Sequence, residues 1–248
     1  MLKKERQAHI LHRVNVHNRV MSGDLCSEMS VSEDTIRRDL NELSEQGKII
    51  KVHGGALSKS FHSSLQPTDV YSQDKKIAIA RKAASLIHDG MFVLTTGGTT
   101  IIELARLLPE NLKATFITGS LPAAMEYIQH PNLDVIFIGD KISRNSQITV
   151  GGEAIWKIRQ IKADICFLGI NAIDINQGIT DSDWEVVQVK KAMIESSDKV
   201  VALTISEKIN TVQKIAISSL KKVDMLITEL PSNDPLLTPY RSAGLKVL

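Results

Sequence analysis

Apolar positions in the N-terminal part of the chain follow helical spacing and then strand-like spacing. Residues 3–14 and 32–47 each carry apolar residues on one helical face, and residues 21–31 are typical of a short helix between two turns. Residues 48–57, KIIKVHGGAL, place β-prone residues before a glycine turn, which predicts a hairpin. A helix, a short helix, a turn, a longer helix and a hairpin in this order predict a winged helix-turn-helix domain.

The helix expected over residues 32–47 has clear boundaries in the sequence. Ser32 can cap its N-terminus, acidic residues follow in the first turn, and Gly47 is suited to end it. Its apolar stripe consists of Ile36, Leu40 and Leu43. This stripe predicts which side of the helix packs against the rest of the domain.

Arg37 and Arg38 lie outside this stripe and are open to two interpretations. On a solvated helix face, Arg38 would pair with Asp34 or Glu42, each four residues away. In a helix-turn-helix domain, the N-terminal half of this helix would instead enter the major groove of DNA. The side chains nearest to phosphates and base edges would then be Ser32, Thr35, Arg37 and Arg38.

The rest of the chain alternates short apolar runs with helical patterns. Residues 58–76 are rich in serine and lack apolar periodicity, so we expect a linker there. Strand-like runs follow at residues 91–96, 114–118, 134–139, 165–169, 200–204 and 224–228, with helical patterns at 77–87, 100–108, 121–129 and 154–161. This alternation predicts an α/β domain with a mostly parallel sheet. The expected division is a DNA-binding domain over 1–57, the linker over 58–76 and an α/β domain over 77–248.

Ligands of parallel sheets bind beyond the carboxyl ends of the strands, where this chain carries small and polar residues. TTGGTT, residues 95–100, places adjacent glycines and hydroxyls at an expected helix start, which can bind an anion. An ordinary strand-to-helix turn would have a similar sequence. The candidates are Thr96, Gly97, Gly98, Thr99, Thr100, Ser120, Gly152, Asn171, Thr180, Asp183 and Lys190. Their donors, carboxylate and lysine suit a phosphorylated polyol.

Composition narrows these possibilities only slightly. The chain has 248 residues with 30 Lys and Arg against 28 Asp and Glu, and the whole positive excess falls within the first 60 residues. This weak excess agrees with DNA binding without requiring it. Cys26 and Cys166 have neither a CxxC motif nor a histidine pair nearby, so we expect no disulfide framework, no metal site and no cofactor. Without a signal peptide or an apolar run of membrane-spanning length, we expect a soluble, cytoplasmic protein.

Three N-terminal segments carry a more specific signal. ERQAHIL, VSEDTIRRDLNEL and VHGGA, within residues 3–57, resemble the DNA-binding domain of the DeoR family of bacterial transcriptional regulators. The combination of TIRRDL with HGGA is more specific than a helix-turn-helix pattern alone. The resemblance implies that Arg37 and Arg38 contact DNA, and it adds His53 and Gly54 of the wing to the candidate DNA contacts.

The segments TTGGTT, TGS, FLGINAID and GITDSDWEVVQVKKAM, from about residue 75 onwards, are similar to the effector domain of the same family. This resemblance implies a ribose-5-phosphate isomerase-like fold and a sugar-phosphate ligand, and it adds Lys208 of LTISEK to the candidate ligand contacts. Three positions depart from the family pattern, because Thr95 and Ile205 replace aspartates and Gly119 replaces an asparagine. The resemblance therefore implies a retained phosphate end of the pocket and an altered sugar end.

Three functions agree with these features. The first is a transcriptional regulator, expected to repress genes of carbohydrate metabolism and to change its affinity for double-stranded operator DNA when a phosphorylated sugar binds. The second is an aldose–ketose phosphate isomerase, for which Asp183, Glu185 and Lys190 offer acid–base groups. The third is a constitutive DNA-binding protein with an inactive sensor. We favour the regulator, without enzymatic activity, as a homo-oligomer, because a symmetric operator requires at least a dimer.

Overall fold

The computed structural model describes residues 1–59 and 70–248. The chain divides into two compact units, Met1–Tyr71 and Ser72–Leu248, and each is described by itself. Most of the expected linker, residues 60–69, lies outside the described residues.

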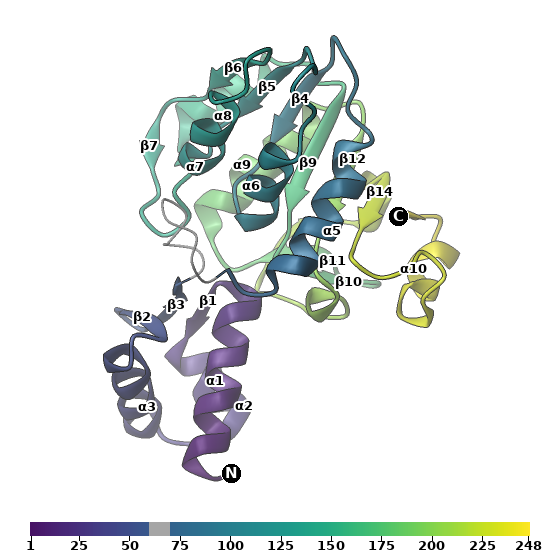
Figure 1. Cartoon of the computed structure of the whole chain (residues 1–248). Coiled ribbons are helices and arrows are strands. Elements are labelled where there is room, and N and C mark those ends of the chain that lie inside the picture. Colours follow the sequence, from purple (N-terminus) through teal and green to yellow (C-terminus); the bar gives the residue numbers. More distant parts are fainter. Residues whose placement is uncertain (60–69) are drawn as a thin grey trace. The chain divides into compact units, whose positions relative to one another are not determined.

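Over residues 1–59, the N-terminal unit consists of three helices and a small antiparallel sheet (Figure 1). The helices are α1 (Lys3–His17), α2 (Ser22–Met29) and α3 (Glu33–Glu45), and the strands, in the order β1-β3-β2, are β1 (Arg19–Met21), β3 (Gly55–Ser58) and β2 (Ile49–Val52). The expected winged helix-turn-helix is therefore confirmed, with β2 and β3 as the wing. The sequence pattern does not predict β1, because three residues are too few to show an alternation.

The α3 helix packs through the stripe that the sequence indicates. Ile36, Leu40 and Leu43 are almost fully buried in a core shared with α1 and α2. Burying a side chain of this size contributes about 1.5–3 kcal/mol relative to leaving it in water. After the helix, Gly47 adopts a φ of +67°, a conformation that glycine reaches without strain.

The C-terminal unit is an α/β domain built on a parallel sheet (Figure 1). Over residues 70–248 this sheet has seven strands in the order β15-β14-β12-β9-β4-β5-β6. They are β4 (Phe92–Thr95), β5 (Thr115–Thr118), β6 (Asp134–Phe137), β9 (Ile165–Gly169), β12 (Val200–Leu203), β14 (Met225–Ile227) and β15 (Lys246–Val247). The six apolar runs form six of these strands, which confirms the predicted parallel sheet. The sequence does not predict β15, which has only two residues.

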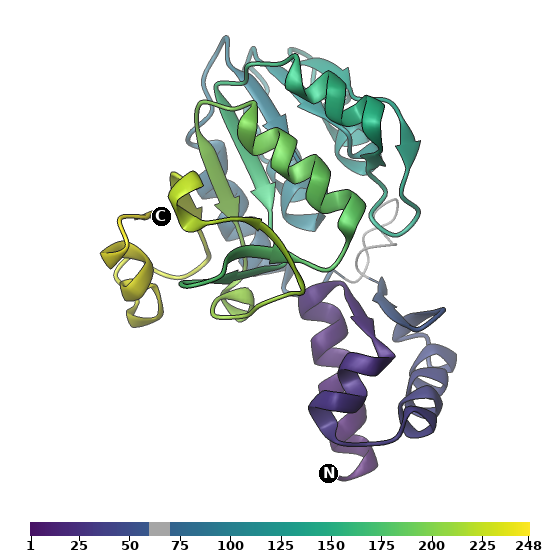
Figure 2. The same ribbon diagram turned by 180° about the vertical axis from the view of Figure 1, so that it is seen from behind.

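Helices cover both faces of this sheet. One face carries α5 (Gln73–Ala84), α6 (Thr99–Arg106) and α7 (Leu121–Tyr127), and the opposite face carries α8 (Gly152–Arg159) and α9 (Trp184–Glu195), as Figure 2 shows from behind. This arrangement buries both sides of the strands, so the strands read as continuous apolar runs rather than as an alternation.

Short antiparallel elements accompany the main sheet. They are the sheet of β10 (Ala172–Asp174), β11 (Gly178–Asp181) and β13 (Ile215–Ser218), and the pair of β7 (Lys141–Ile142) and β8 (Thr149–Val150). The remaining elements are the 3-10 turns η1 (Ser206–Lys208), η2 (Leu220–Lys222) and η3 (Pro235–Leu237) and the helix α10 (Thr238–Ser242). The sequence pattern predicts none of these antiparallel strands.

The expected linker over residues 58–76 is too long at both ends. Ser58 is fully buried as the last residue of β3, and α5 already begins at Gln73, four residues before the helix expected over 77–87. The first turn of α5 shows no apolar periodicity because its residues are polar. Lys76 is nevertheless buried. The pattern of hydrophobic residues cannot predict this, because Lys76 is a charged residue.

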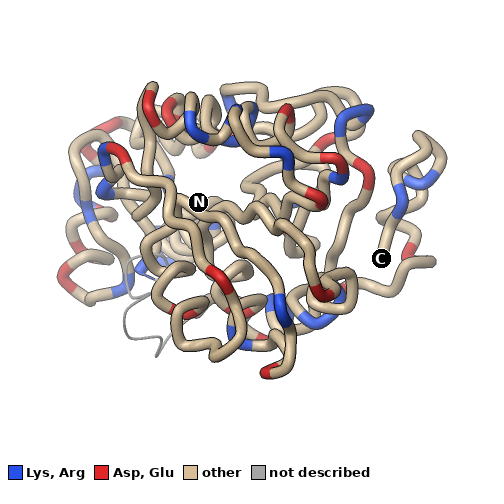
Figure 3. Tube along the Cα trace, turned by 90° about the horizontal axis from the view of Figure 1, so that it is seen from above, with Lys and Arg blue, Asp and Glu red and all other residues tan. Residues whose placement is uncertain are grey.

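Acidic and basic residues are interspersed along the trace (Figure 3). In the part of the chain that the structure describes, no helix has both the length and the apolar character needed to cross a membrane.

Candidate functional site

The α3 helix presents both arginines of TIRRDL to solvent. The Arg37 and Arg38 side chains are 67% and 76% exposed, and each has a guanidinium nitrogen 2.7 Å from a carboxylate oxygen of Asp34. The hydrogen bond from Arg37, and then the charge of Arg38, lower the pKa of the Asp34 carboxyl. The pairing expected of a solvated face therefore exists with Asp34, whereas Glu42 bonds to α1. Exposed ion pairs of this kind are weak, so both guanidinium groups can exchange Asp34 for DNA phosphates.

The other predicted DNA contacts lie at the start of α3 and at the tip of the wing. Ser32 caps α3, since its Oγ accepts a hydrogen bond from the Thr35 backbone N–H at 3.3 Å and lies 2.9 Å from the Thr35 hydroxyl. His53 and Gly54 are exposed between β2 and β3, and Gly54 has a φ of +73°. A Cβ on Gly55 would collide with the backbone of β1, so the second glycine permits close strand packing.

Asp39 of the same motif has a structural role that the sequence reading missed. It is buried and accepts hydrogen bonds from the Arg6 guanidinium at 2.5 and 3.2 Å, which ties α3 to α1. The Asp39 bond raises the pKa of Arg6. Its position four residues after Thr35 and between two apolar positions, Ile36 and Leu40, could have indicated a buried carboxylate.

The glycine-rich loop in the C-terminal unit connects β4 to α6. Gly98 is the N-cap of α6 with a φ of +112°, and Thr99 and Thr100 form the first turn, all of them partly exposed. The Thr96 hydroxyl is already engaged, because it accepts a hydrogen bond from Gly169 N at 2.8 Å and so ties β4 to β9. The loop therefore offers backbone N–H groups and two hydroxyls at a helix N-terminus, an arrangement that suits an anion.

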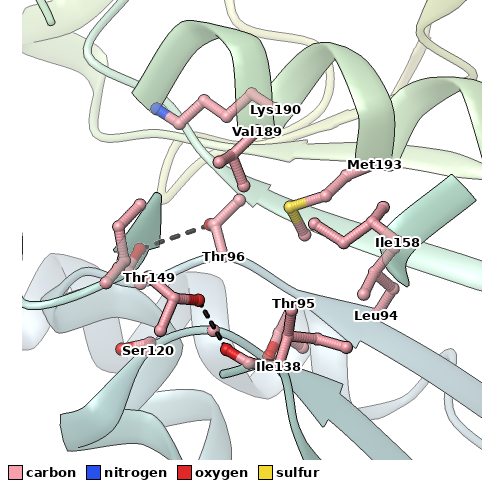
Figure 4. Close-up of a pocket in the computed structure, with 13 residues that line it drawn as sticks. Leu94, Thr95, Thr96, Ser120, Ile138, Thr149, Ile158, Val189, Lys190 and Met193 are labelled. Atoms are coloured by element: carbon pink, nitrogen blue, oxygen red, sulfur yellow. Dashed lines mark hydrogen bonds between the residues drawn. The ribbon is translucent and has the colours of Figure 1, made fainter. Parts of the chain in front are cut away.

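A small cavity lies beside this loop (Figure 4). Its volume of about 10 Å³ has room for about one water molecule. Thr149 on its wall donates a hydrogen bond to the Ile138 carbonyl oxygen at 2.6 Å. The lining residues are Leu94, Thr95, Thr96, Gly97, Gly119, Ser120, Ile138, Ile148, Thr149, Ile158, Val189, Lys190 and Met193. Of the predicted ligand contacts, Thr96, Gly97, Ser120 and Lys190 thus meet at one place.

A buried polar network joins further predicted residues to this cavity. Lys190 Nζ lies 2.7 Å from Asp181 Oδ2, and the two side chains are 5% and 2% exposed. Asn171 Nδ2 donates to Asp181 Oδ1 at 3.1 Å. Lys208 Nζ donates to Asn171 Oδ1 at 3.3 Å and to the Ile170 carbonyl oxygen at 3.1 Å. Asn171, Lys190 and Lys208 are therefore brought together through Asp181.

Lysines of this network influence one another electrostatically. Burial lowers the pKa of Lys208 to about 7. The charges of Lys76 and Lys190 also lower this pKa, whereas the carboxylates of Asp181 and Glu207 raise it. Burial also lowers the pKa of Lys76 to about 8. A ligand anion beside these amines would favour their protonated forms.

Three predicted ligand contacts belong neither to the cavity wall, nor to the glycine-rich loop, nor to the buried network. Asp183 caps α9, since its carboxylate accepts hydrogen bonds from the backbone N–H groups of Glu185 and Val186 at 3.1 and 3.3 Å. The Thr180 hydroxyl accepts a hydrogen bond from Gln213 N at 2.7 Å, and Gly152 is exposed at the start of α8. The sequence suggested these residues as ligand contacts because they are polar and lie near strand ends. Polar residues at such positions also cap helices or form hydrogen bonds within turns.

Asp181 of the network and the buried Lys76, whose charge acts on Lys208, were not among the sequence candidates. Lys190 lies on the buried face of α9, and this alone could have indicated a buried acidic partner such as Asp181. Lys76 gave no such signal, because it belongs to a polar segment that reads as linker.

Two of the three departures from the family pattern, Thr95 and Gly119, line the cavity, which therefore has no carboxylate or amide at those positions. Thr95 is buried and accepts a hydrogen bond from the Tyr127 hydroxyl at 3.3 Å. A Cβ on Gly119 would collide with the Thr149 hydroxyl, so a larger residue there would require the Thr149 side chain to move. Ile205 is buried. Among the described residues, no group of acidic, histidine or cysteine side chains could hold a metal ion.

Two family models match the chain. The DeoR-like helix-turn-helix domain matches residues 6–61, and the DeoR C terminal sensor domain matches residues 71–230. The chain belongs to the DeoR family. As a DeoR-family protein it is a transcriptional regulator that binds DNA through its N-terminal domain, and its C-terminal domain is a sensor domain.

Similar curated proteins support this assignment over the full length. The HTH-type transcriptional regulator GolR of Listeria innocua is 31% identical over 100% of this chain and 98% of that protein. The HTH-type transcriptional repressor GlcR of Bacillus subtilis is 31% identical over 100% and 96%. The glycerol-3-phosphate regulon repressor of Escherichia coli is 29% identical over 93% and 92%.

Solved structures give weaker similarities to this DeoR-family chain. A D-ribose-5-phosphate isomerase in complex with phospho-erythronic acid aligns with 55% of this chain and 54% of its own at 16% identity, with a TM-score of 0.41. The eIF2B delta subunit of Chaetomium thermophilum aligns with 63% and 57% at 18% identity, with a TM-score of 0.46. Similarity at this level carries no argument about ligand or activity.

Proposed function

We propose that this regulator represses genes of carbohydrate metabolism, and that a phosphorylated sugar or polyol bound in the sensor domain changes its affinity for operator DNA. The names of similar proteins support this, since one is the glycerol-3-phosphate regulon repressor of Escherichia coli and another the repressor GlcR. The proposed DNA contacts are Ser32, Thr35, Arg37, Arg38, His53 and Gly54.

The observation that carries the ligand proposal is the buried network of Lys190, Asp181, Asn171 and Lys208 beside the glycine loop. In this proposal, the N–H groups and hydroxyls of Gly97–Thr100 bind the phosphate, and a lysine supplies the opposite charge. Asn171, which is partly exposed, offers its amide to sugar hydroxyls, whereas Asp181 holds Lys190 in place. Such a site distinguishes a phosphorylated sugar from the same sugar without its phosphate.

The size of the cavity sets a condition on this proposal. A space for about one water molecule does not hold a whole sugar phosphate, so lining side chains must change rotamer as the ligand enters. Met193 suits this role, because an unbranched thioether side chain adapts to irregular space. The phosphate itself lies at the partly exposed loop, outside the narrowest part of the cavity.

We further propose that the sensor domain is not an isomerase. An isomerase needs a general base free to act on the substrate carbon. Asp183 caps a helix and Asp181 is paired with Lys190, so each of these carboxylates already has a structural role. Binding without turnover agrees with the family to which the chain belongs.

The small cavity favours a second candidate, a constitutive DNA-binding protein with an inactive sensor. Calorimetric titration of the full-length protein distinguishes the two. Sugar phosphates that raise the melting temperature in a thermal-shift screen are titrated together with their unphosphorylated forms, since a ligand at 100 times its Kd stabilises by about 2.7 kcal/mol. Heat from the phosphorylated form alone supports the proposal. Equal heats from both forms, or no heat from any compound, would exclude it.

A further inference from the structure

The outermost strand β6 has an exposed free edge. It pairs with β5 on one side only, and among the described residues no strand pairs with its other side. Ile136 and Phe137 are 45% and 39% exposed although both are large and apolar. Free edges of sheets are commonly protected by short strand length, charged side chains, proline or a bulge. The strand β6, with the sequence Asp-Val-Ile-Phe, has only four residues and begins with the exposed Asp134, but its last three residues include neither a charge nor a proline.

The unpaired hydrogen-bonding groups of this edge can be assigned. Asp134 N and Ile138 N donate to β5-side carbonyl oxygens, those of Ala114 and Thr118, at 3.0 and 2.9 Å. Successive N–H groups of a strand point to opposite sides within the sheet. The N–H groups of Val135 and Phe137 therefore point to the free edge.

The neighbouring helix α7 continues the apolar surface. Leu121, Met125 and Ile128 recur at helical spacing and are 41%, 46% and 55% exposed, which is unusual for a complete apolar stripe. Glu126 is the one charged residue within α7, and it is paired with Arg106 at 2.5 Å. The α7 helix packs beside β6 at the same end of the sheet (Figure 1).

We call five side chains at this edge the β6 edge surface: Leu121, Met125, Ile128, Ile136 and Phe137. Successive side chains of a strand alternate between the two faces of the sheet, so Phe137 lies on the face that carries α7 and Ile136 lies on the opposite face. Half-exposed side chains of this size each leave on the order of 100 Å² of apolar surface in water. Summed over both faces of the edge, this exposed apolar area is a large part of the roughly 800 Å² per partner that a standard interface buries.

We propose that the β6 edge surface is the interface of a two-fold symmetric homodimer in which β6 strands of two copies pair antiparallel. The occupant is a second copy because the surface is self-complementary. One two-fold axis perpendicular to the sheet at its edge pairs β6 with β6 and at the same time places α7 against α7. The paired edge extends the sheet across both subunits. A dimer also provides the two helix-turn-helix domains that a two-fold symmetric operator requires.

The register of this pairing follows from the outward-pointing groups. In the antiparallel pair, Val135 of one copy lies opposite Phe137 of the other and exchanges two backbone hydrogen bonds with it. This register places Ile136 on the two-fold axis, directly opposite Ile136 of the second copy. Ile136 then forms a non-hydrogen-bonded pair, in which the two Cα atoms are about 4.5 Å apart. This distance falls within the range that a disulfide bridges.

Sedimentation equilibrium of the full-length chain tests the interface. The wild type should be a dimer or a multiple of it. The double variant Met125→Lys/Ile128→Lys, and separately Val135→Pro, should weaken self-association at least 100-fold and halve the mass at micromolar concentration. Val135→Pro removes only an edge N–H and leaves the bonds to β5 intact. Val212→Lys is the matched control, since Val212 is 50% exposed outside this surface, and it should leave the mass unchanged.

A cysteine cross-link provides the second measurement, independent of the stability of these variants. Ile136→Cys in a Cys26→Ser background should form an intersubunit disulfide under mild oxidation, and Val212→Cys in the same background should not. A monomeric wild type at about 100 µM, folded edge variants that keep the wild-type mass, or absence of the Ile136→Cys cross-link would each overturn the proposal. Because the interface involves no ligand residue, these results are independent of those for sugar-phosphate binding.

Discussion

Lys190 and Asp181 form an almost fully buried ion pair, with 2.7 Å between Nζ and Oδ2, in the wall of the sensor-domain cavity. Burial raises the pKa of the Asp181 carboxyl, but the charge and hydrogen bond of Lys190 outweigh this and lower it. The Asp181 carboxyl is therefore charged at neutral pH. The pair connects α9 to β11 and fixes the amine of Lys190 beside the cavity.

Removing one partner of this pair should be costly. In Asp181→Asn the Lys190 amine stays buried without its counter-charge, and the free energy of unfolding should fall by about 3–5 kcal/mol. Urea unfolding followed by circular dichroism measures this change. The matched control is Glu185→Gln, which removes the exposed Lys141–Glu185 pair and should cost less than about 1 kcal/mol. Equal losses in the two variants would show that the buried pair contributes no more than a surface pair.

The two exposed arginines of α3 should act on DNA binding and not on folding. Arg38→Ala should weaken operator binding by about 1–3 kcal/mol if Arg38 reads a base edge, whereas Arg37→Ala should weaken binding to all sequences alike if it contacts phosphate. Both variants should melt at the wild-type temperature, since both side chains are exposed. Gel-shift titration measures both effects. Unchanged operator affinity in the double variant would contradict the assignment of α3 as the recognition helix.

Asp34 should oppose DNA binding, because its carboxylate pairs with both arginines in the free protein. Asp34→Asn keeps the shape of the side chain, releases the two guanidinium groups and removes a negative charge near the phosphates. Affinity should therefore rise, most clearly at low salt, where phosphate contacts are strongest. Reduced affinity in the same titration would mean that the Asp34 pairing positions the arginines for DNA.

The glycine loop should not tolerate a negative charge. Gly98→Asp places a carboxylate where we propose the phosphate binds, and ligand affinity should be lost through repulsion. Gly98→Asn is the matched control, because it carries the same backbone strain at a φ of +112° without the charge. Calorimetry should detect residual binding only in Gly98→Asn, and operator binding should be similar in both. Equal ligand affinities would exclude a phosphate at this loop.

Ligand binding should take up a proton above neutral pH. The pKa of Lys208 is about 7 without ligand, and a bound phosphate would raise it, so affinity should be full below pH 7 and fall as pH rises through the ligand-bound pKa. Calorimetry at pH 8 in buffers of different ionisation enthalpy measures the uptake, to which Lys76 also contributes. Lys208→Arg, which stays charged, should reduce it. The same uptake in wild type and Lys208→Arg would contradict the role of Lys208.

The sequence predicts the fold of this protein well where local patterns decide the structure. The stripe of Ile36, Leu40 and Leu43 defines α3, and apolar runs define the main strands of the parallel sheet. The order of those strands and the antiparallel strands cannot be read in this way, because they depend on contacts between distant segments. Asp181 illustrates the difference, since its pairing with Lys190 arises only when β11 packs against α9.

The same limit applies to single residues. Asp183 has the sequence features of both a ligand contact and a helix cap, and the structure makes it a cap. Leu121, Met125 and Ile128 have the spacing of a core stripe, yet they are exposed because β6 is the last strand and no further helix covers them among the described residues. Whether an apolar helix stripe is buried or exposed depends on whether the helix lies at the edge of the sheet. The spacing of apolar residues along the sequence does not show this.

The central claim is that a phosphorylated sugar controls operator binding. The most direct measurement is an operator titration, with the operator obtained by selection from a random DNA library and each sugar phosphate from the thermal-shift screen added at saturation. We predict that at least one phosphorylated sugar changes operator affinity of the wild type tenfold or more, that its unphosphorylated form does not, and that Gly98→Asp binds operator without responding. Operator affinity that stays the same with every sugar phosphate, in wild type and Gly98→Asp alike, would contradict the account.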